Sequence, residues 1–371
     1  MDAILVINAG SSSVKFSLFG VDERLPQLAH GEVSNLGNRP VFSAFHGEAG
    51  AVANRQLEPD ASAEDGLRAI IDWILGHEDG LDVVAVAHRI VHGGGEFSGP
   101  VRVTPDILRQ LEQLCPLAPL HQPHNLAALG IVDRLLTHAP QIACFDTAFH
   151  ALHEPLFRLY ALPQDLMEKG VRRYGFHGLS YEWISLVLKR EHPELARGRV
   201  IAAHLGNGAS ICAMRNGKSI DTTMGMTVLD GLPMGTRSGA LDPGAVLYMI
   251  NTLGIPAAEV EHVLYEQSGL KGLSGQTNDV RALLASDDPR ARFALDYFAL
   301  RVAQYMAMLA VSIGGVDGVV FTGGIGENAA PVRDAVMKHL GFLDVPCVLV
   351  IPADEERVMA LQALGRLGRH D

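Results

Sequence analysis

Cysteine is scarce in this sequence and shows no metal-binding pattern. The 371 residues include only four cysteines, at widely separated positions: Cys115, Cys144, Cys212 and Cys347. No two of them have the paired spacing of a zinc site or of a redox motif. We therefore expect reduced cysteines that pack in the core.

Long apolar runs are also missing. The longest run, Val302–Val316, falls short of the roughly 20 residues that a membrane-spanning helix needs. The first residues include Asp2 and only a short apolar run, so they lack the basic region and long apolar core of a secretion signal. These absences predict a cytoplasmic protein that does not associate with membranes.

Basic charge is outnumbered as well. Thirty Lys and Arg residues stand against 42 Asp and Glu, a net charge of −12 at pH 7, which argues against general binding of nucleic acid. Glycine is plentiful, with 39 residues, and 48% of the chain is hydrophobic. This composition is typical of a globular protein with many tight turns, and the length predicts two domains.

Apolar strands alternate with helical patterns in the first half of the chain. The stretch 81–90 is nearly continuous in apolar residues, and a helical pattern follows Thr104, which is expected to cap it. A second apolar strand, 141–146, ends at Asp146. The alternation predicts a mainly parallel sheet whose ligands gather beyond the strand ends, where Arg89 and Asp146 both fall.

The stretch NAGSSS, residues 8–13, is a loop of small residues between two strands. It lacks the Lys-Ser/Thr pair of a P-loop and the three spaced glycines of a dinucleotide fold. Residues 199–220 repeat the strand-loop-strand pattern, with GNGAS at 206–210 in the loop. The repeat predicts a duplicated fold and favours two phosphate loops over two ordinary hairpin turns.

These segments together resemble the acetate kinase family over nearly the whole chain. The resemblance rests on ten ordered motifs: INAGSSSVKF, AHRIVHGGG, LAPLHQPHN, FDTAFH, RRYGFHGLS, AHLGNGAS, MGTRSGALDPG, GLSGQTNDVR, FTGGIGEN and IPADEE. It implies an α/β fold of two similar actin-like (ribonuclease H-like) domains, with a duplicated βββαβαβα core and an active-site cleft between them. The implied domains are an N-terminal acetokinase domain, 1–148 plus 354–371, and a nucleotide-binding domain, 149–353.

The resemblance also implies a reaction, the reversible transfer of the γ-phosphoryl group of ATP to acetate, and a homodimer. Because a carboxylate acceptor is already ionised at neutral pH, the reaction needs no base, and positive charge must stabilise the transferring group. Arg237 and His177 match the family residues for that task, and Arg89 matches the residue that binds the acid. Asp146 matches a catalytic position, and we expect it to orient an arginine or a magnesium-bound water.

Further binding residues follow from the same resemblance. The apolar end of the acid is expected to contact a pocket formed by Val91, Leu120, Phe176 and Val228. His121 is expected to lie beside this pocket. The phosphates of ATP or ADP are expected at Ser11, Ser13, Lys15, His204, Leu205, Gly206, Asn207 and Gly208. The adenosine end is expected at Asp279, Val280, Arg281, Gly323, Gly324, Ile325, Gly326 and Glu327. The expected ligands of Mg²⁺, with Mn²⁺ as the alternative, are Asn8 and Glu355.

Two departures from the family pattern affect the acid site. The chain reads HQPHN where the family commonly has HNPAN, which changes the surroundings of His121 through Gln122 and His124. Val228 stands where a proline is common in the pocket wall. Since one methylene is worth only about 0.8 kcal/mol on burial, both acetate and propionate are expected to be accepted.

Each assignment also has a structural alternative. Arg89 fits a strand-end arginine paired with a core carboxylate, and Asp146 fits a helix cap. His177 fits a core histidine, and Glu355 fits the solvated face of the last helix. For the whole chain, the alternatives are a propionate or butyrate kinase and, in a different class, an actin- or chaperone-like ATPase module, which has no need of an acceptor site built from Arg89 and Arg237.

Overall fold

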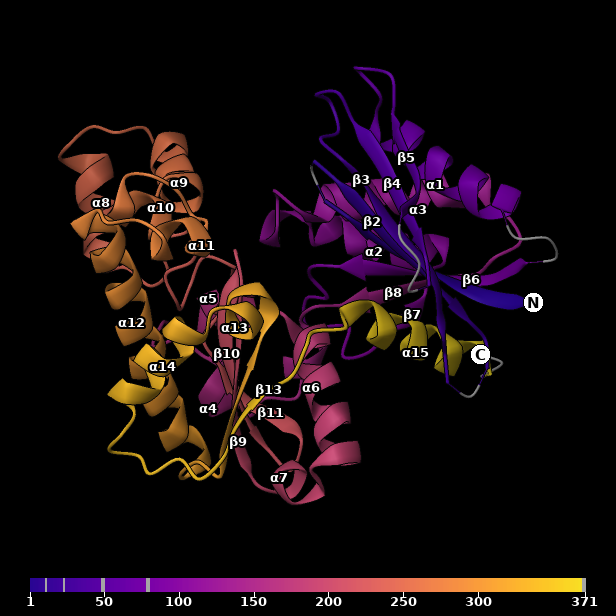
Figure 1. Ribbon diagram of the computed structural model, residues 1–371. Coiled ribbons are helices and arrows are strands. Elements are labelled where there is room, and N and C mark those ends of the chain that lie inside the picture. The colour runs from indigo at the N-terminus through magenta and orange to yellow at the C-terminus, as the bar shows by residue number, and fades with distance from the viewer. Residues whose placement is uncertain (11, 23, 48–50, 78–80, 369–371) are drawn as a thin grey trace. The chain divides into compact units, whose positions relative to one another are not determined.

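The computed structural model describes residues 1–10, 12–22, 24–47, 51–77 and 81–368. They form two compact units (Figure 1). The first unit combines Met1–Ala148 with the segment that starts at Asp354, and the second comprises Phe149–Ala353. Each unit is built on one β-sheet with helices packed against it.

The sheet of the first unit has the strand order β5-β4-β3-β2-β1-β6-β8-β7. Its strands are β1 (Asp2–Ala9), β2 (Val14–Gly20), β3 (Gln27–Ser34), β4 (Val41–His46), β5 (Ala51–Gln56), β6 (Asp82–Ile90), β7 (Val101–Arg102) and β8 (Gln141–Phe145). Strands β1 to β5 form an antiparallel meander, whereas β1, β6 and β8 run parallel.

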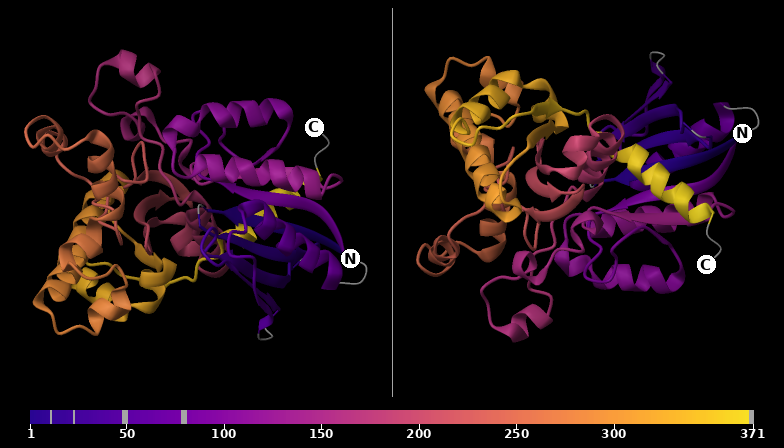
Figure 2. Two further views of the ribbon diagram at one scale, coloured as in Figure 1. Left: turned by 90° about the horizontal axis from the view of Figure 1, so that it is seen from above. Right: turned by 90° about the horizontal axis from the view of Figure 1, so that it is seen from below.

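Helices cover both faces of this sheet (Figure 2). They are α1 (Ala63–His77), α2 (Pro105–Gln113), α3 (Gln122–Leu135) and α15 (Glu355–Leu367), with a 3-10 turn at Cys115–Leu117. Leu5 and Ile7 of β1 pack in one core cluster with residues of α1 and α3. Ile4 and Val6 point to the opposite face, which α15 covers, so β1 is buried on both sides.

The sheet of the second unit has the order β11-β10-β9-β12-β13. Its strands are β9 (Arg199–Leu205), β10 (Ala209–Arg215), β11 (Lys218–Thr222), β12 (Gly318–Thr322) and β13 (Val348–Val350). Strands β9 to β11 are antiparallel, and β9, β12 and β13 are parallel. Asn216 and Gly217 have φ angles of 55° and 67°, as a two-residue hairpin requires.

The same order, β3-β2-β1-β6-β8, lies within the first sheet, so the predicted duplication is confirmed. The expectation of a mainly parallel sheet was wrong, because only two strand pairs in each unit are parallel. The pattern of residues 27–56 did not predict strands β3 to β5, which make the first sheet larger and mostly antiparallel.

The helices of the second unit surround its sheet (Figure 1). They are α4 (Pro155–Arg158), α5 (Gln164–Glu168), α6 (Gly178–Glu191), α7 (Pro193–Arg197), α8 (Pro243–Asn251), α9 (Ala257–Glu266), α10 (Gly269–Ser274), α11 (Val280–Leu284), α12 (Pro289–Ile313), α13 (Gly323–Asn328) and α14 (Ala330–His339). A further 3-10 turn spans Ala148–His150. Within the described ranges, no helix has the length and apolar character needed to cross a membrane.

The cysteines are all free, as expected, but they are not all in the core. Cys144 and Cys212 are buried, whereas Cys115 and Cys347 are only partly buried. Cys115 lies in the 3-10 turn after α2, and Cys347 lies in the loop that precedes β13. Both lie outside the regular α-helices and strands, where the burial of a short apolar side chain depends on the local path of the chain.

Candidate active site

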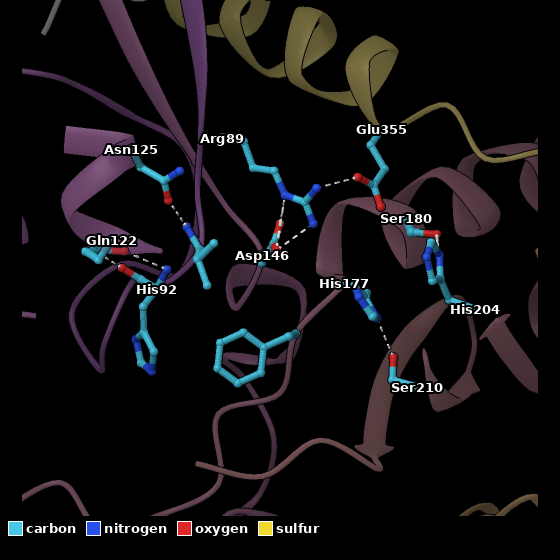
Figure 3. A network of polar contacts seen from close by, with 12 residues as sticks. Arg89, His92, Gln122, Asn125, Asp146, His177, Ser180, His204, Ser210 and Glu355 are labelled. Carbon is cyan, nitrogen blue, oxygen red and sulfur yellow. Dashed lines mark hydrogen bonds and ion pairs between the residues drawn. The ribbon is translucent and has the colours of Figure 1, made fainter. Parts of the chain in front are cut away.

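An arginine and two carboxylates meet at one edge of the first sheet (Figure 3). Arg89 is the penultimate residue of β6, and Asp146 directly follows the parallel neighbour β8. Glu355 is the first residue of α15. Adjacent parallel strands end at the same edge of a sheet, which explains why residues 57 positions apart come together.

The Arg89 guanidinium donates to both carboxylates. Its Nε lies 2.9 Å from Asp146 Oδ1, and its Nη2 lies 2.8 Å from Asp146 Oδ2, which is a bidentate pair. Its Nη1 lies 3.1 Å from Glu355 Oε2. The side chains of Asp146 and Glu355 are only 4% and 13% exposed, so Glu355 does not lie on a solvated helix face, and the Asp146 carboxylate is engaged by Arg89.

Burial and charge act in opposite directions in this group. Burial disfavours the charged guanidinium, but the carboxylates of Asp146 and Glu355 outweigh it and raise the pKa of Arg89. Burial raises the pKa of the Asp146 carboxyl, although Arg89 lowers it. Burial and the charge of Glu355 likewise raise the pKa of Glu356. One arginine therefore faces several carboxyls, and the group has a deficit of positive charge.

The first turn of α3 holds the backbone beside this group. Asn125 Oδ1 accepts from Val91 N at 3.1 Å, and its Nδ2 donates to Ala9 O at 2.7 Å. Gln122, which is fully buried, accepts from His92 N and donates to His92 O. These side-chain amides fix the backbone where β1 and β6 end. Gln122, which departs from the common family pattern, therefore holds the backbone at His92.

In the second unit, His177 is held in an unusual conformation. It immediately precedes α6 and has a left-handed φ of 56°, which costs roughly 1–2 kcal/mol for a non-glycine residue. Its Nδ1 lies 2.9 Å from Ser210 Oγ, which in turn lies 2.5 Å from the Tyr181 hydroxyl. A strained backbone that is fixed from several sides is typical of a functional position.

The glycine loop between β9 and β10 faces His177. A Cβ on Gly208 would lie 3.3 Å from His177 Nε2 and 3.8 Å from Arg237 Nη1. The loop, the histidine and the arginine therefore converge on the space that a side chain at Gly208 would fill. Cationic and N–H donors around a backbone cradle suit a phosphoryl group.

Arg237 differs from Arg89 in having no carboxylate within ion-pair distance among the residues that the structure describes. Its Nη1 donates to the Val228 carbonyl at 3.3 Å. The side chain is partly buried, and burial lowers the pKa of Arg237. The charge of Glu266 opposes this effect only in part, and a desolvated arginine that has no ion-paired carboxylate among the described residues favours an anion at this position.

The remaining phosphate-loop residues are ordered by their neighbours. His204 Nδ1 lies 2.8 Å from Ser180 Oγ, and its ring stacks on that of His177 at 4.4 Å between centroids. Asn207 Oδ1 accepts from Asn278 Nδ2, and a Cβ on Gly235 would collide with this oxygen. Leu205 is buried and Gly206 N donates to Gly208 O, so the turn is rigid.

The predicted adenosine residues lie on two short helices. Glu327 of α13 accepts from Gly323 N at 2.9 Å and from Ala353 N at 3.0 Å, so its carboxylate is engaged by the backbone. Gly323 has a left-handed φ of 77°, and a Cβ on Gly324 would meet no described atom within 4 Å. Ile325 and Gly326 follow in the same helix, α13. In α11, Asp279 caps the helix, Val280 is buried, and Arg281 extends into solvent.

The other predicted residues of the first unit surround the ends of β1 and β6. Asn8 and Lys15 are register partners on β1 and β2, and Ser13 O accepts from Gly10 N in the loop that joins them. Ser11 lies outside the described residues. His121 precedes α3. Of the acid-pocket residues, Val91 is buried and Leu120 is 45% exposed. Phe176, which is buried, and Val228, which is partly buried, belong to the second unit.

The two predicted metal ligands are of the chemical type that Mg²⁺ binds. The amide of Asn8 and the carboxylate of Glu355 are hard oxygen ligands, and the carboxylates around Arg89 leave negative charge for a cation to balance. No cluster of three or more His, Cys, Asp or Glu ligands occurs in the ranges that the structure describes. Mg²⁺ keeps several waters and needs only one or two protein oxygens, so the two observations agree.

Several positioning residues were not among the site residues predicted from the sequence. Ser180, Ser210, Gln122 and Asn125 are buried polar residues whose partners lie 11 to 116 positions away. Only the polar pair at i and i+3 in the first turn of α3 interrupts its apolar face, and this interruption could have marked Gln122 and Asn125.

Comparisons with known proteins agree with this geometry. A family model described as the Acetokinase family matches residues 3–360. An acetate kinase of Rhodopseudomonas palustris is 45% identical over 375 residues, which cover 100% of this chain and 92% of the relative.

Two crystal structures are also similar to the chain. A propionate kinase of Francisella tularensis has a TM-score of 0.92 at 35% identity and covers 98% of this chain and 100% of its own. The acetate kinase of Porphyromonas gingivalis has a TM-score of 0.88 at 34% identity, with 99% and 100% covered. The actin-like two-domain fold is therefore confirmed.

Proposed function

The chain belongs to the acetokinase family, and on that premise we propose that it catalyses the acetate kinase reaction. In this reaction the γ-phosphoryl group of ATP passes directly and in line to the carboxylate of acetate, giving acetyl phosphate and ADP, and the transfer is reversible. The enzyme class is that of phosphotransferases with a carboxyl group as acceptor.

The observation that carries the proposal is the convergence of Arg237, His177 and Gly208. Arg237, which has no ion-paired carboxylate among the described residues, and His177 lie 3.8 Å and 3.3 Å from the position that a Cβ on Gly208 would take, so a group held by this loop would contact both side chains. As the phosphoryl group transfers, charge spreads over its equatorial oxygens, and the guanidinium and the imidazole N–H stabilise it. Such a site has a clear use in transfer between two anions.

Arg89 binds the acid in this proposal, and Asp146 orients Arg89. The bidentate pair and Glu355 use three of the five guanidinium N–H groups, which leaves two for a carboxylate. Because acetate is ionised at neutral pH, Asp146 has no proton to remove from it. Its three contacts with Arg89 support an orienting role.

Asn8 and Glu355 would hold Mg²⁺, which supplies charge neutralisation at the phosphates. Ser13, Lys15 and the loop from His204 to Gly208 would hold the phosphate chain. Asp279 to Arg281 and the turn from Gly323 to Glu327 would lie at the adenosine end. Because these residues come from both units, catalysis would require the two units to close on the substrates and exclude water.

Acetate is favoured as the acid over longer acids. The relative at 45% identity is an acetate kinase, whereas the propionate kinase structure is 35% identical. Val91, Leu120, Phe176 and Val228 would form the apolar wall. One additional methylene changes discrimination by about 1–3 kcal/mol in such a pocket, so propionate would be a poorer substrate that still reacts.

A homodimer fits the exposed apolar residues of α12. Phe293, Tyr297 and Val311 are 57%, 38% and 82% exposed on this helix, and a face of this kind is typical of an interface. Sedimentation of the purified protein should give twice the chain mass of 39.8 kDa. A cytoplasmic location fits the use of ATP and the four free cysteines.

The decisive experiment measures ADP release from Mg-ATP by the purified protein with no acid, acetate, propionate or butyrate. We expect release that depends on acid, with acetate the best acceptor, and loss of this dependence in Arg89→Ala. Release that ignores the acid would instead indicate an ATPase module. Equal rates with propionate or butyrate would remove the preference for acetate while leaving the carboxylate kinase intact.

A further inference from the structure

A buried histidine outside the predicted site lies directly behind His177. His150 is 1% exposed, and its Nε2 lies 2.9 Å from the carbonyl oxygen of Phe176. Its Nδ1 lies 2.8 Å from Ser219 Oγ, which is also 2.6 Å from His153 Nε2. None of His150, His153 and Ser219 has a role in the proposed reaction.

The hydrogen-bond partners determine where the protons of this group reside. Burial lowers the pKa of His150 to about 4, so its ring is neutral at pH 7 and carries one N–H. The Phe176 carbonyl only accepts, so the N–H is at Nε2 and Nδ1 accepts the Ser219 hydroxyl proton. Ser219 has no second proton, and His153 Nε2 must therefore donate to it.

The contact of His150 with the backbone is tight. Gly175 has a φ of 82°, and a Cβ there would lie 2.7 Å from His150 Cδ2. The backbone at Gly175 and Phe176 therefore packs directly against the imidazole ring of His150. The Phe176 carbonyl belongs to the peptide plane that defines the φ angle of His177, so a bond to this oxygen acts directly on the left-handed conformation.

The side chain of His177 is fixed from the same group. Tyr181 contacts the His150 ring edge to face, with 5.7 Å between centroids, and its hydroxyl lies 2.5 Å from Ser210 Oγ. Ser210 Oγ then lies 2.9 Å from His177 Nδ1. His150 thus acts on His177 along two routes, through the Phe176 peptide and through Tyr181.

We propose that His150 is a positioning residue for phosphoryl transfer, whose Nε2–H holds the Phe176 peptide and so keeps His177 turned toward the Gly208 loop. This inference rests on the proposed function, since it assigns His177 to the transferring group. Ser219 takes part by donating its hydroxyl proton to His150 Nδ1, which is compatible with an N–H at Nε2. His153 shares the Ser219 contact, but its Nε2 is engaged by Ser219 and not by the Phe176 carbonyl, which makes it a matched control.

The test compares His150→Leu, His150→Gln and His153→Leu in acid-dependent ADP release. Misplacing a catalytic group by about 1 Å can cost on the order of 100-fold, so we expect His150→Leu to lower kcat by about 10- to 100-fold with little change in the KM for ATP. The amide N–H of His150→Gln should restore most of kcat. His153→Leu, which loses a buried histidine of the same kind, should keep it.

A second readout does not depend on turnover. Nitrogen-15 spectra of the histidine rings should show His150 as the Nε2–H tautomer and should show the His177 ring signal displaced in His150→Leu but not in His153→Leu. An Nδ1–H tautomer, an unmoved His177 signal, or equal effects of the two leucine variants would overturn the proposal. Should His150→Leu not fold, His150→Asn takes its place: its shorter amide cannot reach the Phe176 carbonyl, so kcat must fall and the His177 signal must move, and no change in either overturns the proposal.

The two proposals fail differently. Wild-type protein without acid-dependent transfer would remove the proposed function while the ring signals still report whether His150 controls His177. Normal transfer by His150→Leu would remove the positioning role alone.

Discussion

Strands β6 and β12 occupy the same position in the two sheets, but their carboxyl ends differ. β6 ends with Arg89, which is bonded to Asp146 and Glu355. β12 ends at Thr322 and runs into Gly323 and the short helix α13, where Glu327 binds backbone N–H groups. One unit has a group of paired charges at this position, and the other has a turn of small residues.

The arginines show the same contrast. Arg89 is surrounded by carboxylates, whereas the hydrogen bonds of Arg237 within the described part of the chain go to a carbonyl and a thioether, and the charge of Glu266 acts on it without an ion pair. The duplicated topology therefore fixes where side chains gather, and the residues at each strand end decide the charge found there.

The largest expected effect is on stability. Arg89→Met leaves the buried carboxylates of Asp146 and Glu355 unpaired and should destabilise the first unit by about 3–5 kcal/mol. Arg237→Met removes a desolvated charge that has no carboxylate partner among the described residues, so the second unit should change by only about 1 kcal/mol. Native-state hydrogen exchange of peptides from β6 and β10 measures both. Equal losses in the two variants would contradict the contrast.

A smaller effect is expected from the two corresponding loops. Gly208→Ala would place a methyl group 3.3 Å from His177 Nε2, in the proposed phosphoryl site, and should lower kcat by about 10- to 100-fold. Gly10→Ala in the first unit meets only Ser13 O at 3.5 Å, an ordinary contact, and should have a milder effect. Steady-state kinetics with both variants tests this, and a larger loss in Gly10→Ala would reverse the assignment.

The smallest effect is a difference in acid sensitivity. Burial lowers the pKa of His150 to about 4 and that of His153 to about 3, both in the second unit. Between these values and the ordinary value near 6.5, the unfolded chain binds more protons than the folded one. The free energy of unfolding therefore decreases as the pH is lowered through this window, by up to about 1.4 kcal/mol per pH unit for each histidine.

The stability of the first unit should decrease less than that of the second unit when the pH is lowered. Burial lowers the pKa of His88 to about 3, but it raises the pKa values of Asp146 and Glu356, which favours the folded state as pH falls. Among the described residues of the second unit, Asp221 is the carboxyl whose pKa burial raises in this way. Hydrogen exchange at pH 7 and pH 5, corrected for the intrinsic rate, should show greater loss of protection in β10 than in β6. His153→Leu should reduce the difference, and equal losses would exclude this explanation.

Local patterns predicted local structure well. Thr104 caps α2 through its side chain, and residues 199–220 contain two strands joined by a loop, as the sequence indicated. Strand pairing is not local, and the antiparallel pairing of β3 to β5 has no signature in residues 27–56. This is why the sheets were expected to be mainly parallel.

The site was predicted to a similar extent. The strand patterns alone indicated that Arg89 and Asp146 lie at strand ends, and the structure pairs them. The contact of Glu355 with Arg89 depends on the return of α15, which spacing does not reveal. His150 and Ser219 could not be assigned from sequence, because a buried polar residue is recognised only by partners that folding brings to it.

Helix α15 has a consequence for the order of folding during synthesis. Its buried residues Val358, Met359 and Ala360 complete the face of the first sheet, and Glu355 completes the group around Arg89. The ribosome adds about 5–20 residues per second, so the intervening Phe149–Ala353 occupies on the order of 10–40 s. The unit that begins first must therefore wait with one face uncovered until the contiguous second unit has been made, and it is the part of the nascent chain most in need of a chaperone.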